Sequence, residues 1–559
     1  MNRVWTRRRT TWPWVLPALL LVGPFLAWPL GAMVWRAVTP DGAFALQPLG
    51  DVLGDRYYWE RLAFTAGQAA ASTAIALAVG IPAAYVFARL RFPLQGLLLA
   101  LLTVPFVLPT LVVAIAFQRL AGPDGWLNEL LEAAGLEPVR PLGTIWILLA
   151  AHVFYNVAVV IRLVSVVWRN LDPRTEEAAR LLGAGPWSAF RAVTLPALTP
   201  AILSAAALVF TFTFTSFGVV LVLGAGNPDL DTLEVVVYRL ATRLVELPAA
   251  ALVSVIQVAA SVAALTLYSV FQRGATRSLG LRGDHATRLR RAGGGQVLFA
   301  LPVLVLLIAF IVTPMAALVH GALTVGATDT VTLENFTTLF DDTGRQSFIP
   351  PLDAMRWSLT FAAGSAAIAT VVGLASARVI AYSRGAVGAV ADALLMLPLT
   401  VPAVVLGFGY LVTFNREPYD LRGSLWLVFA AHALVAYPFV LRSALSTLRA
   451  LDPRVPEAAR MLGASAWTVW WRVEFPILRR PLLAGALFAF AVSLGEFGAT
   501  VLLQRQEFAT LPIAIFDALG RPGEANLGHA LALSTILMAV TAAAFLLIER
   551  LRYRDATGF

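Results

Sequence analysis

Twelve apolar runs, each long enough to cross a lipid bilayer, constrain the fold of this 559-residue chain more than any other feature. A helix needs about 20 mostly apolar residues to cross the hydrocarbon core. Only 13% of the residues are charged, whereas a soluble domain has roughly 25%. We therefore predict an all-α polytopic membrane protein with about twelve transmembrane helices. The expected spans are residues 12–34, 63–88, 94–117, 142–167, 201–223, 248–271, 297–320, 357–382, 387–412, 425–445, 481–503 and 527–547.

The distribution of arginine predicts the side of the membrane for each loop, because cytoplasmic loops carry the excess of positive charge. Arginines cluster before the first span and after the second, fourth and sixth, whereas the opposite loops carry more acids. Both chain ends are then expected in the cytoplasm of a bacterial cell, on the inner side of its (inner) membrane. This topology accounts for the net charge of +9, so the charge does not indicate nucleic-acid binding. The first run continues to Val34 without a small-x-small cleavage site, which favours a retained span over a signal peptide.

The chain is duplicated, and a polar segment carries the clearest signal. The sequence LDPRTEEAARLLGAGPWSAFRAVTLP begins at Leu171, and LDPRVPEAARMLGASAWTVWWRVEFP begins at Leu451, which is 280 positions later (451 minus 171). Earlier in the two halves the offset is 293, from Pro109 to Pro402 (402 minus 109). The difference places an insertion of 13 residues (293 minus 280) in the outer loop around residues 121–140, since loops tolerate insertions.

Six spans in each half give both halves the same polarity in the membrane. We therefore expect two parallel six-helix repeats, related by a pseudo-twofold axis along the membrane normal. The first repeat is predicted over residues 1–272 and the second over residues 296–559, with a cytoplasmic linker at 273–295 that is rich in Arg and Gly. The polar segments, called the duplicated segments below, occupy residues 171–200 and 451–480.

Each duplicated segment is predicted to form a capped helix outside the bilayer, followed by a short helical piece that ends before Pro196 or Pro476. Asp172 is a favourable N-cap, and Gly183 suits the left-handed position after a helix. Asp452 and Gly463 repeat this pattern. A helix resting on the lipid surface is the alternative. Two copies at equal places, with similar polar detail, favour a docking site for a partner.

The spacing Glu-Ala-Ala, three residues, Gly, then nine residues to a hydrophobic-x-Leu-Pro ending resembles the cytoplasmic EAA loop of ABC importer permeases. The second copy departs from it at Phe475, which replaces the Leu. In that family, which has the type I importer fold, the loop is a coupling helix that inserts into a groove of the ATP-binding subunit. The resemblance therefore assigns coupling to the ATPase to Glu177, Ala178, Ala179, Gly183 and Pro196, and to Glu457, Ala458, Ala459, Gly463 and Pro476.

The chain contains no lysine, so all 42 basic residues are arginine. A P-loop needs a lysine for the β- and γ-phosphates of ATP, so this chain is not expected to be an ATPase. ATP and Mg should be bound by another polypeptide, and this chain should hold no cofactor of its own. Two docking segments imply two copies of a cytoplasmic ABC ATPase. The absence of cysteine excludes disulfides and thiolate metal sites.

Polar groups inside spans are functional candidates, because they are costly to bury in lipid. Matching segments follow the two duplicated segments, and Glu496 would supply a counter-charge for a cation. The alternative is structural, because rings often pack and hydroxyls often bond to carbonyls of their own helix. His152 and His432 are expected to bridge helices rather than to bind metal. The predicted translocation path comprises Thr213, Thr215, Ser216, Phe217, Gly218, Ser493, Glu496, Phe497 and Gly498.

Most of the chain resembles the fused permease of bacterial thiamine importers, in which Thr-Leu-Glu/Pro segments, here at Thr232 and Thr510, follow the pore helices. Ferric-iron permeases share the fused layout and stay an alternative. The resemblance implies a small cationic cargo, thiamine or a phosphorylated form, delivered by a periplasmic or lipid-anchored binding protein. A transporter driven by an ion gradient would not need paired docking segments. No nucleophile–base pair indicates an intramembrane enzyme.

Overall fold

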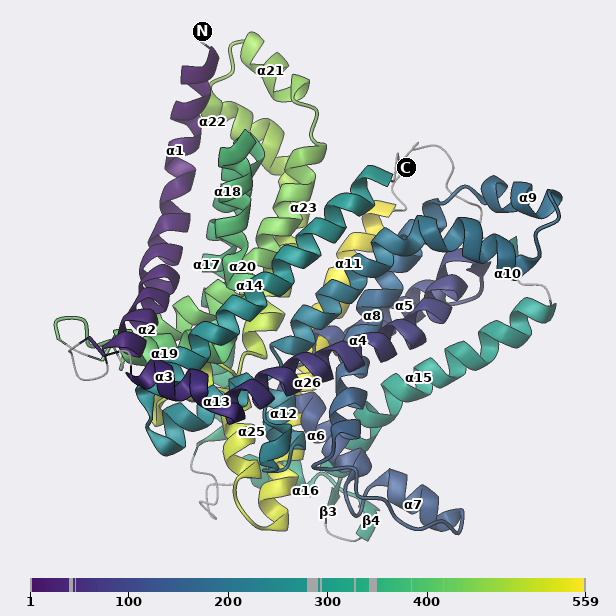
Figure 1. Ribbon diagram of the computed structural model, residues 1–559, viewed down its shortest axis with the longest axis vertical. Helices are drawn as coiled ribbons and strands as arrows, with labels where there is room; N and C mark the ends of the chain where they lie inside the picture. The colour runs from purple at the N-terminus through teal and green to yellow at the C-terminus, as the bar shows by residue number, and fades with distance from the viewer. Residues whose placement is uncertain are drawn as a thin grey trace.

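The computed structural model describes residues 3–39, 44–45, 47–278, 290–291, 294–325, 328–340, 349–383, 385–415, 417–421 and 423–556 (Figure 1). Within these residues, ten helices are long and apolar enough to cross a membrane. Two bent helix pairs pass the same test only when each pair is taken together, which gives up to twelve spans. The prediction of an all-α polytopic membrane protein is confirmed.

The helices follow one another with short connections, and the label η marks a π- or 3₁₀-helix. Those of the first half are α1 (Arg3–Val22), η1 (Gly23–Ala27), α2 (Trp28–Val38), α3 (Gln47–Gly54), α4 (Arg56–Arg89), α5 (Gln95–Val107), α6 (Thr110–Ala121), α7 (Trp126–Ala133), α8 (Ile145–Asn170), α9 (Pro173–Leu181), α10 (Pro186–Ala189), η2 (Phe190–Thr194), α11 (Leu195–Phe214), α12 (Gly218–Leu223), η3 (Pro228–Leu230), α13 (Leu233–Arg239), η4 (Leu240–Leu244) and α14 (Leu247–Ser278). Those of the second half are α15 (Gly294–Ala322), α16 (Glu334–Thr337), η5 (Thr338–Phe340), α17 (Pro351–Tyr382), α18 (Gly385–Met396), η6 (Leu397–Leu399), α19 (Ala403–Thr413), α20 (Leu425–Ala450), α21 (Arg454–Met461), α22 (Ala466–Val469), η7 (Trp470–Glu474), α23 (Phe475–Leu494), α24 (Thr500–Leu503), η8 (Gln506–Phe508), α25 (Leu511–Leu519) and α26 (Glu524–Ala556).

Four short strands form two small two-stranded sheets among the described residues. β1 (Leu90–Arg91) pairs in parallel with β2 (Arg290–Arg291), with Leu90 opposite Arg290. β3 (Thr324–Val325) pairs antiparallel with β4 (Thr328–Val331), with Thr324 opposite Val331. The β1–β2 pair therefore holds the end of α4 against the chain that leads into the second half.

Two of the predicted spans, residues 94–117 and 387–412, are broken near their middle. The axis turns by 103° between the helix that ends at Val107 and the one that begins at Thr110, and by 90° at the equivalent place in the second half. Pro109 and Pro402 stand at these breaks with ψ values of 138° and 141°. A proline lacks the N–H that a helix needs, and it disfavours a helical residue before it. Each of these two predicted spans is therefore a bent pair of helices, and the total reaches twelve when each pair is taken as one span.

Matched close contacts show that the two halves are copies of one fold. Gly80 of α4 packs on Val160 of α8, where an added Cβ would lie 2.7 Å from the valine Cβ. Gly373 of α17 packs on Val440 of α20 with the same 2.7 Å separation. The offsets are 293 (373 minus 80) and 280 (440 minus 160), which are the two offsets found in the sequence.

The first helices of the two halves are exchanged. α1 and α2 belong to the first half in sequence but pack on α17 and α19 of the second. Conversely, α15 packs on α6 of the first half, and α26 packs on α5 and α6. Neither half therefore buries its helices without the other, and the two repeats form one intertwined body (Figure 1).

The predicted linker is only partly visible. α14 continues to Ser278, beyond the predicted end of the first repeat at residue 272, and α15 begins at Gly294. Residues 279–289 and 292–293 lie outside the described residues. The repeat boundaries and the cytoplasmic position of the chain ends stay predictions.

Candidate functional site: two docking helices and two interrupted pore helices

Each duplicated segment begins with a capped helix that projects from the body of the molecule, α9 in the first half and α21 in the second (Figure 1). Asp172 and Asp452 each accept a hydrogen bond at Oδ1 from the backbone N–H two residues later, both at 2.9 Å. Gly183 and Gly463 follow the helices with left-handed φ values of +93° and +86°. Caps at both ends explain why these short polar helices form without lipid or core around them.

The ends of α9 and α21 expose pairs of large apolar side chains. Leu181 and Leu182 are 89% and 90% exposed, and Met461 and Leu462 are 88% and 89% exposed. Of the predicted coupling residues, Glu177, Ala178, Glu457 and Ala458 are exposed, whereas Ala179 and Ala459 are half-buried. Nearly complete exposure of apolar side chains, at equal places in two repeats, indicates a surface that another protein covers.

The helical piece after each docking helix was predicted to end before Pro196 or Pro476, and this prediction was wrong. The chain continues instead as one long helix over Pro186–Phe214 in the first half and Ala466–Leu494 in the second. Each proline lies two residues after the end of a π-helical turn, η2 or η7. The wider bonding pattern of a π-turn accommodates a residue without an N–H, which is why the proline does not stop the helix. A continuous rod therefore connects each docking helix with the interior.

Inside the bundle, both of these rods are interrupted at equal places. Residues 215–217 separate α11 from α12, and residues 495–499 separate α23 from α24. The predicted spans 201–223 and 481–503 are therefore not continuous helices. Apolar residues continue on both sides of the breaks, so the overall composition did not predict that the helices are interrupted there.

A glycine at each break lets the chain approach a neighbouring helix. A Cβ added to Gly218 would lie 2.6 Å from Thr110 Oγ1 at the start of α6. A Cβ added to Gly498 would lie 3.0 Å from Ala403 Cβ at the start of α19. Both interrupted pore helices are thereby fixed against the bent helix pairs described above.

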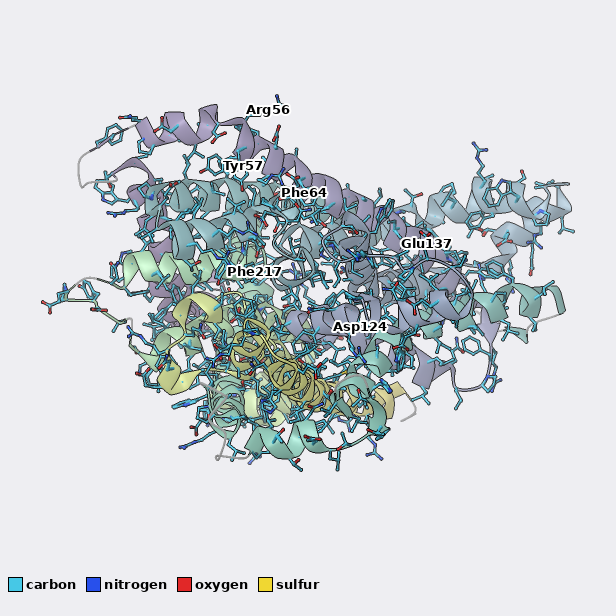
Figure 2. The ribbon with its side chains drawn as sticks, turned by 90° about the horizontal axis from the view of Figure 1, so that it is seen from below. Arg56, Tyr57, Phe64, Asp124, Glu137 and Phe217 are labelled. Carbon is cyan, nitrogen blue, oxygen red and sulfur yellow. The ribbon has the colours of Figure 1, made fainter. Side chains whose placement is uncertain are left out.

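Four aromatic rings connect the two breaks across the interface between the repeats. Phe217 stacks on Phe497 with ring centroids 5.6 Å apart and planes 21° from parallel. Tyr238 of α13 packs against Phe217 at 5.4 Å, and Phe516 of α25 packs against Phe497 at 5.2 Å. Figure 2 shows Phe217 toward the middle of the molecule, with Tyr57 to one side on α4. These four residues, called the aromatic ladder, leave no room for a solute between the central rings.

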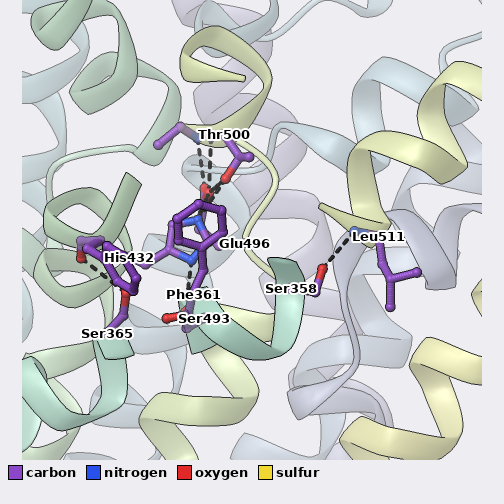
Figure 3. Close-up of polar contacts among 10 residues, drawn as sticks. Ser358, Phe361, Ser365, His432, Ser493, Glu496, Thr500 and Leu511 are labelled. Carbon is purple, nitrogen blue, oxygen red and sulfur yellow. Dashed lines mark hydrogen bonds and ion pairs between the residues drawn. The ribbon is translucent and has the colours of Figure 1, made fainter. Parts of the chain in front are cut away.

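The carboxylate of Glu496 caps α24 (Figure 3). Its Oε1 accepts from the N–H of Ala499 at 2.7 Å, and its Oε2 accepts from the N–H and the hydroxyl of Thr500. His432 Nε2 lies 3.2 Å from Oε2, and His432 Nδ1 lies 2.8 Å from Ser493 Oγ. Both carboxylate oxygens are occupied within the protein in this structure. The role of Glu496 as a counter-charge for a cation stays a prediction.

His152 occupies the corresponding place in the first half. Its Nε2 lies 2.8 Å from Ser216 Oγ, and its Nδ1 lies 3.3 Å from Ser72 Oγ. Each histidine thus joins α8 or α20 to the pore segment beside it. The hydroxyls of Thr213 and Thr215 donate to carbonyls one turn back in α11, at 2.9 and 3.1 Å, which is the structural alternative considered for them.

Sequence reasoning missed a charged cluster between α4 and α13. Asp231 Oδ2 lies 2.8 Å from Arg239 Nη1, and Arg61 Nη1 donates to the carbonyl of Pro228 at 2.8 Å. Burial raises the pKa of Asp231 to about 6, although the nearby arginines oppose this rise. The only signal in the sequence was an arginine at the start of an apolar run.

A second acid in the same region, Glu234 of α13, is 1% exposed. Its Oε1 has no hydrogen-bond partner among the described residues. Burial raises the pKa of this carboxyl well above its usual range. The equivalent residue of the second half is Pro512, as the matched backbone contacts show. Thr65 Oγ1 accepts from the N–H of the residue before Glu234 at 3.0 Å, and Ser358 Oγ accepts from the N–H of the residue before Pro512 at 2.7 Å.

Two homologous halves, each with a docking helix joined to an interrupted pore helix, define a membrane permease built as a fused pair. The family model "Binding-protein-dependent transport system inner membrane component" matches this chain twice, over residues 76–277 and 369–554. The chain belongs to this family and is the multi-span inner-membrane permease subunit of an ABC importer. The predicted two-repeat permease is thereby confirmed.

Similar proteins span nearly the same length. The thiamine transport system permease protein of Escherichia coli is 29% identical over 538 residues, covering 92% of this chain and 93% of the relative. That of Salmonella typhimurium is 28% identical over 564 residues, covering 99% of each. A probable ABC transporter permease protein of Sinorhizobium fredii is 26% identical over 546 residues, covering 94% of each. One chain of a solved bacterial ABC transporter involved in the import of alginate covers 49% of this chain, with 16% identity and a TM-score of 0.43.

Proposed function

We propose that this protein is the permease subunit of a thiamine importer, driven by two copies of a cytoplasmic ABC ATPase. The observation that carries the proposal is the pair of exposed docking helices, joined to a chain that resembles thiamine permeases over nearly its whole length. A periplasmic or lipid-anchored binding protein would deliver the cargo to the side opposite α9 and α21. Both ATP and Mg would be bound by the ATPase subunits.

The continuous helices give a physical route for coupling. An ATPase that closes on its second copy would move α9 and α21, whose exposed apolar ends, at Leu182 and Leu462, would lie in its grooves. The rods over Pro186–Phe214 and Ala466–Leu494 would carry this movement to the breaks beside Phe217 and Phe497. Separation of the stacked rings would then open the path on the delivery side, because alternating access is largely rigid-body movement around a central site.

Thiamine is favoured over ferric iron as cargo. Thiamine permeases of several bacteria match most of this chain, at 26–29% identity. A thiazolium cation with a second aromatic ring also suits a path bordered by the aromatic ladder, because aromatic faces attract cations. Ferric iron would require several hard oxygen ligands instead, and the ladder supplies ring faces with a single phenol oxygen, that of Tyr238.

Uptake of radiolabelled thiamine into proteoliposomes that contain the complete importer tests the proposal. We expect uptake that depends on ATP, the ATPase and the binding protein, and no uptake of radiolabelled iron. The double variant Glu177→Arg plus Glu457→Arg is expected to abolish both uptake and co-purification of the ATPase, because it reverses charge on both docking helices. Undiminished co-purification of the ATPase in detergent would contradict the docking role of these helices. Uptake driven by an ion gradient without the ATPase would contradict an importer driven by ATP.

A further inference from the structure

We propose that Glu234, with the ring of Tyr238 beside it, forms the site that recognises the positive charge of the cargo as it passes between the repeats. This inference rests on the proposed import of a cation, and it assigns Glu234 as the residue that pairs with the positive charge of that cation. A cation needs a carboxylate whose oxygens are available. Glu496, the other acid beside the breaks, already uses both oxygens to cap α24.

The position of Glu234 relative to the aromatic ladder follows from helix geometry. Glu234 and Tyr238 are four residues apart on α13, so their side chains lie on the same face, one turn from each other. Tyr238 packs on Phe217 at 5.4 Å, and Phe217 stacks on Phe497 of the second repeat. α13 also packs on α19 of the second repeat. The carboxyl therefore lies one turn from Tyr238, whose ring packs on one of the two rings that must separate for cargo to pass.

The duplicated fold does not require an acid at this position. α25 holds Pro512 where α13 holds Glu234, and α25 still packs and still places Phe516 on the ladder. A buried carboxyl without a full set of hydrogen bonds is costly, so a purely structural role would favour its loss. Buried acids in membrane proteins that have no structural task are functional candidates.

The chemistry of the pair fits an organic cation. An ionised carboxylate would pair with a thiazolium ring, and the phenol ring of Tyr238 would offer its face to the same charge. Burial favours the neutral acid in the closed structure. Glu234 would release its proton to water in the opened path as the cation arrives, and it would take a proton from water again when the cation leaves. The second repeat contributes no acid at the equivalent position, so one cargo molecule would meet one carboxylate.

The variant Glu234→Gln tests this assignment in proteoliposomes with the complete importer. Two cargoes are compared, thiamine and its neutral thiophene isostere, which has the same shape without the charge. We expect thiamine uptake to fall by about tenfold, the effect of one lost charge-assisted contact, while uptake of the isostere stays unchanged. Glu234→Asp should keep the preference for thiamine. Glu507→Gln is the matched control, since Glu507 is an exposed acid on the equivalent outer side of the second half.

Two results would overturn the assignment: Glu234→Gln with an unchanged preference for thiamine, or an equal loss of both cargoes. Thermal unfolding of the purified variant shows whether it is folded. A wild-type importer that takes up no thiamine would instead overturn the proposed function. If that importer takes up ferric iron, the uptake of iron by the Glu234→Gln variant is measured. Unchanged iron uptake would overturn the role of Glu234 in binding the positive charge of the cargo.

Discussion

At the scale of single residues, the most constrained positions are the glycines at the breaks in the pore helices. Gly218 and Gly498 are not needed for an unusual φ, since neither has one. They are needed for space, because the starts of α6 and α19 come within contact distance of where a Cβ would be. Backbone approach of this kind is what fixes the breaks relative to the bent helix pairs.

Gly218→Ala is expected to destabilise the protein by about 1–3 kcal/mol, because the new methyl would lie 2.6 Å from Thr110 Oγ1 in a packed interior. Thermal unfolding in detergent measures the effect. Gly67→Ala is the matched control, because nothing lies within 4 Å of its added Cβ. An unchanged melting temperature for the Gly218 variant would show that α6 can move away at little cost.

Asp231 predicts a specific dependence of stability on pH. Its pKa is raised from 3.8 to about 6 in the folded protein, with loss of hydration as the largest cause. The folded state therefore binds this proton more tightly, so its contribution to stability is present below pH 3.8 and lost as the pH rises through 6. We expect Asp231→Asn to flatten the fall in melting temperature over this range. Asp229→Asn, an exposed neighbour, should leave the slope unchanged, and equal slopes for all three proteins would refute the prediction.

At the scale of elements, Arg378 of α17 connects the second duplicated segment with helix α1. Arg378 Nη1 of α17 lies 2.7 Å from Glu474 Oε2 of η7, and the two side chains are 11% and 2% exposed. Its guanidinium also lies over the rings of Trp14 and Trp470, at 4.5 and 4.6 Å. This set of residues, called the arginine clamp, connects three elements at the point where the docking segment enters the bundle.

Arg378→Leu is expected to destabilise the protein by about 3–5 kcal/mol, because it leaves the Glu474 carboxylate buried without its counter-charge. Arg56→Leu is the control, since its ion pair with Glu60 has side chains 90% and 47% exposed. An exposed pair of this kind contributes less than about 1 kcal/mol. Denaturation in detergent compares the two variants, and equal losses would argue against a clamp.

Sequence predicted the elements that depend on local chemistry. Asp172 and Gly183 fix the ends of α9 through their own backbone geometry, so the docking helices were foreseen with their caps. The breaks at residues 215–217 and 495–499 were not, because apolar residues continue on both sides. Arg378 and Trp14 are 364 positions apart (378 minus 14), so no local pattern relates them. The burial of Glu234 was equally hidden, since a helix of 7 residues is too short for a clear periodicity.

At the scale of the whole molecule, exchange of the first helices makes the fused chain a single folding unit. α1 packs on α17 of the second half, and α2 packs on both α19 of the second half and α14 of its own. α15 packs on both α6 of the first half and α26 of its own. The central stack of Phe217 on Phe497 also exists only when both halves are present. The repeats are therefore copies in fold but not independent domains.

A chain divided between residues 285 and 286 tests this interdependence. We expect the two halves to assemble and to support thiamine uptake when they are produced together. Either half alone is expected to aggregate or to be degraded, because its first helix and its ladder rings lack their partners. Size-exclusion chromatography in detergent is the measurement, and a stable monomer of either half alone would contradict the prediction.

Among the residues that the structure describes, the arginine clamp occurs in the second half and has no counterpart in the first. The residue of the first half equivalent to Arg378 is Tyr85 (378 minus 293), which meets α15 through the ring of Phe299 at 6.0 Å. Two identical ATPase subunits would therefore act on docking helices that are anchored with unequal stiffness. α21 is anchored beside a buried ion pair, whereas the first half has only ring contacts at the equivalent place. We expect α9, which is anchored less stiffly, to move farther than α21 in each transport cycle. Distance measurements between spin labels on the two docking helices can check this. Equal displacements of α9 and α21 would mean that the arginine clamp does not affect how far the docking helices move.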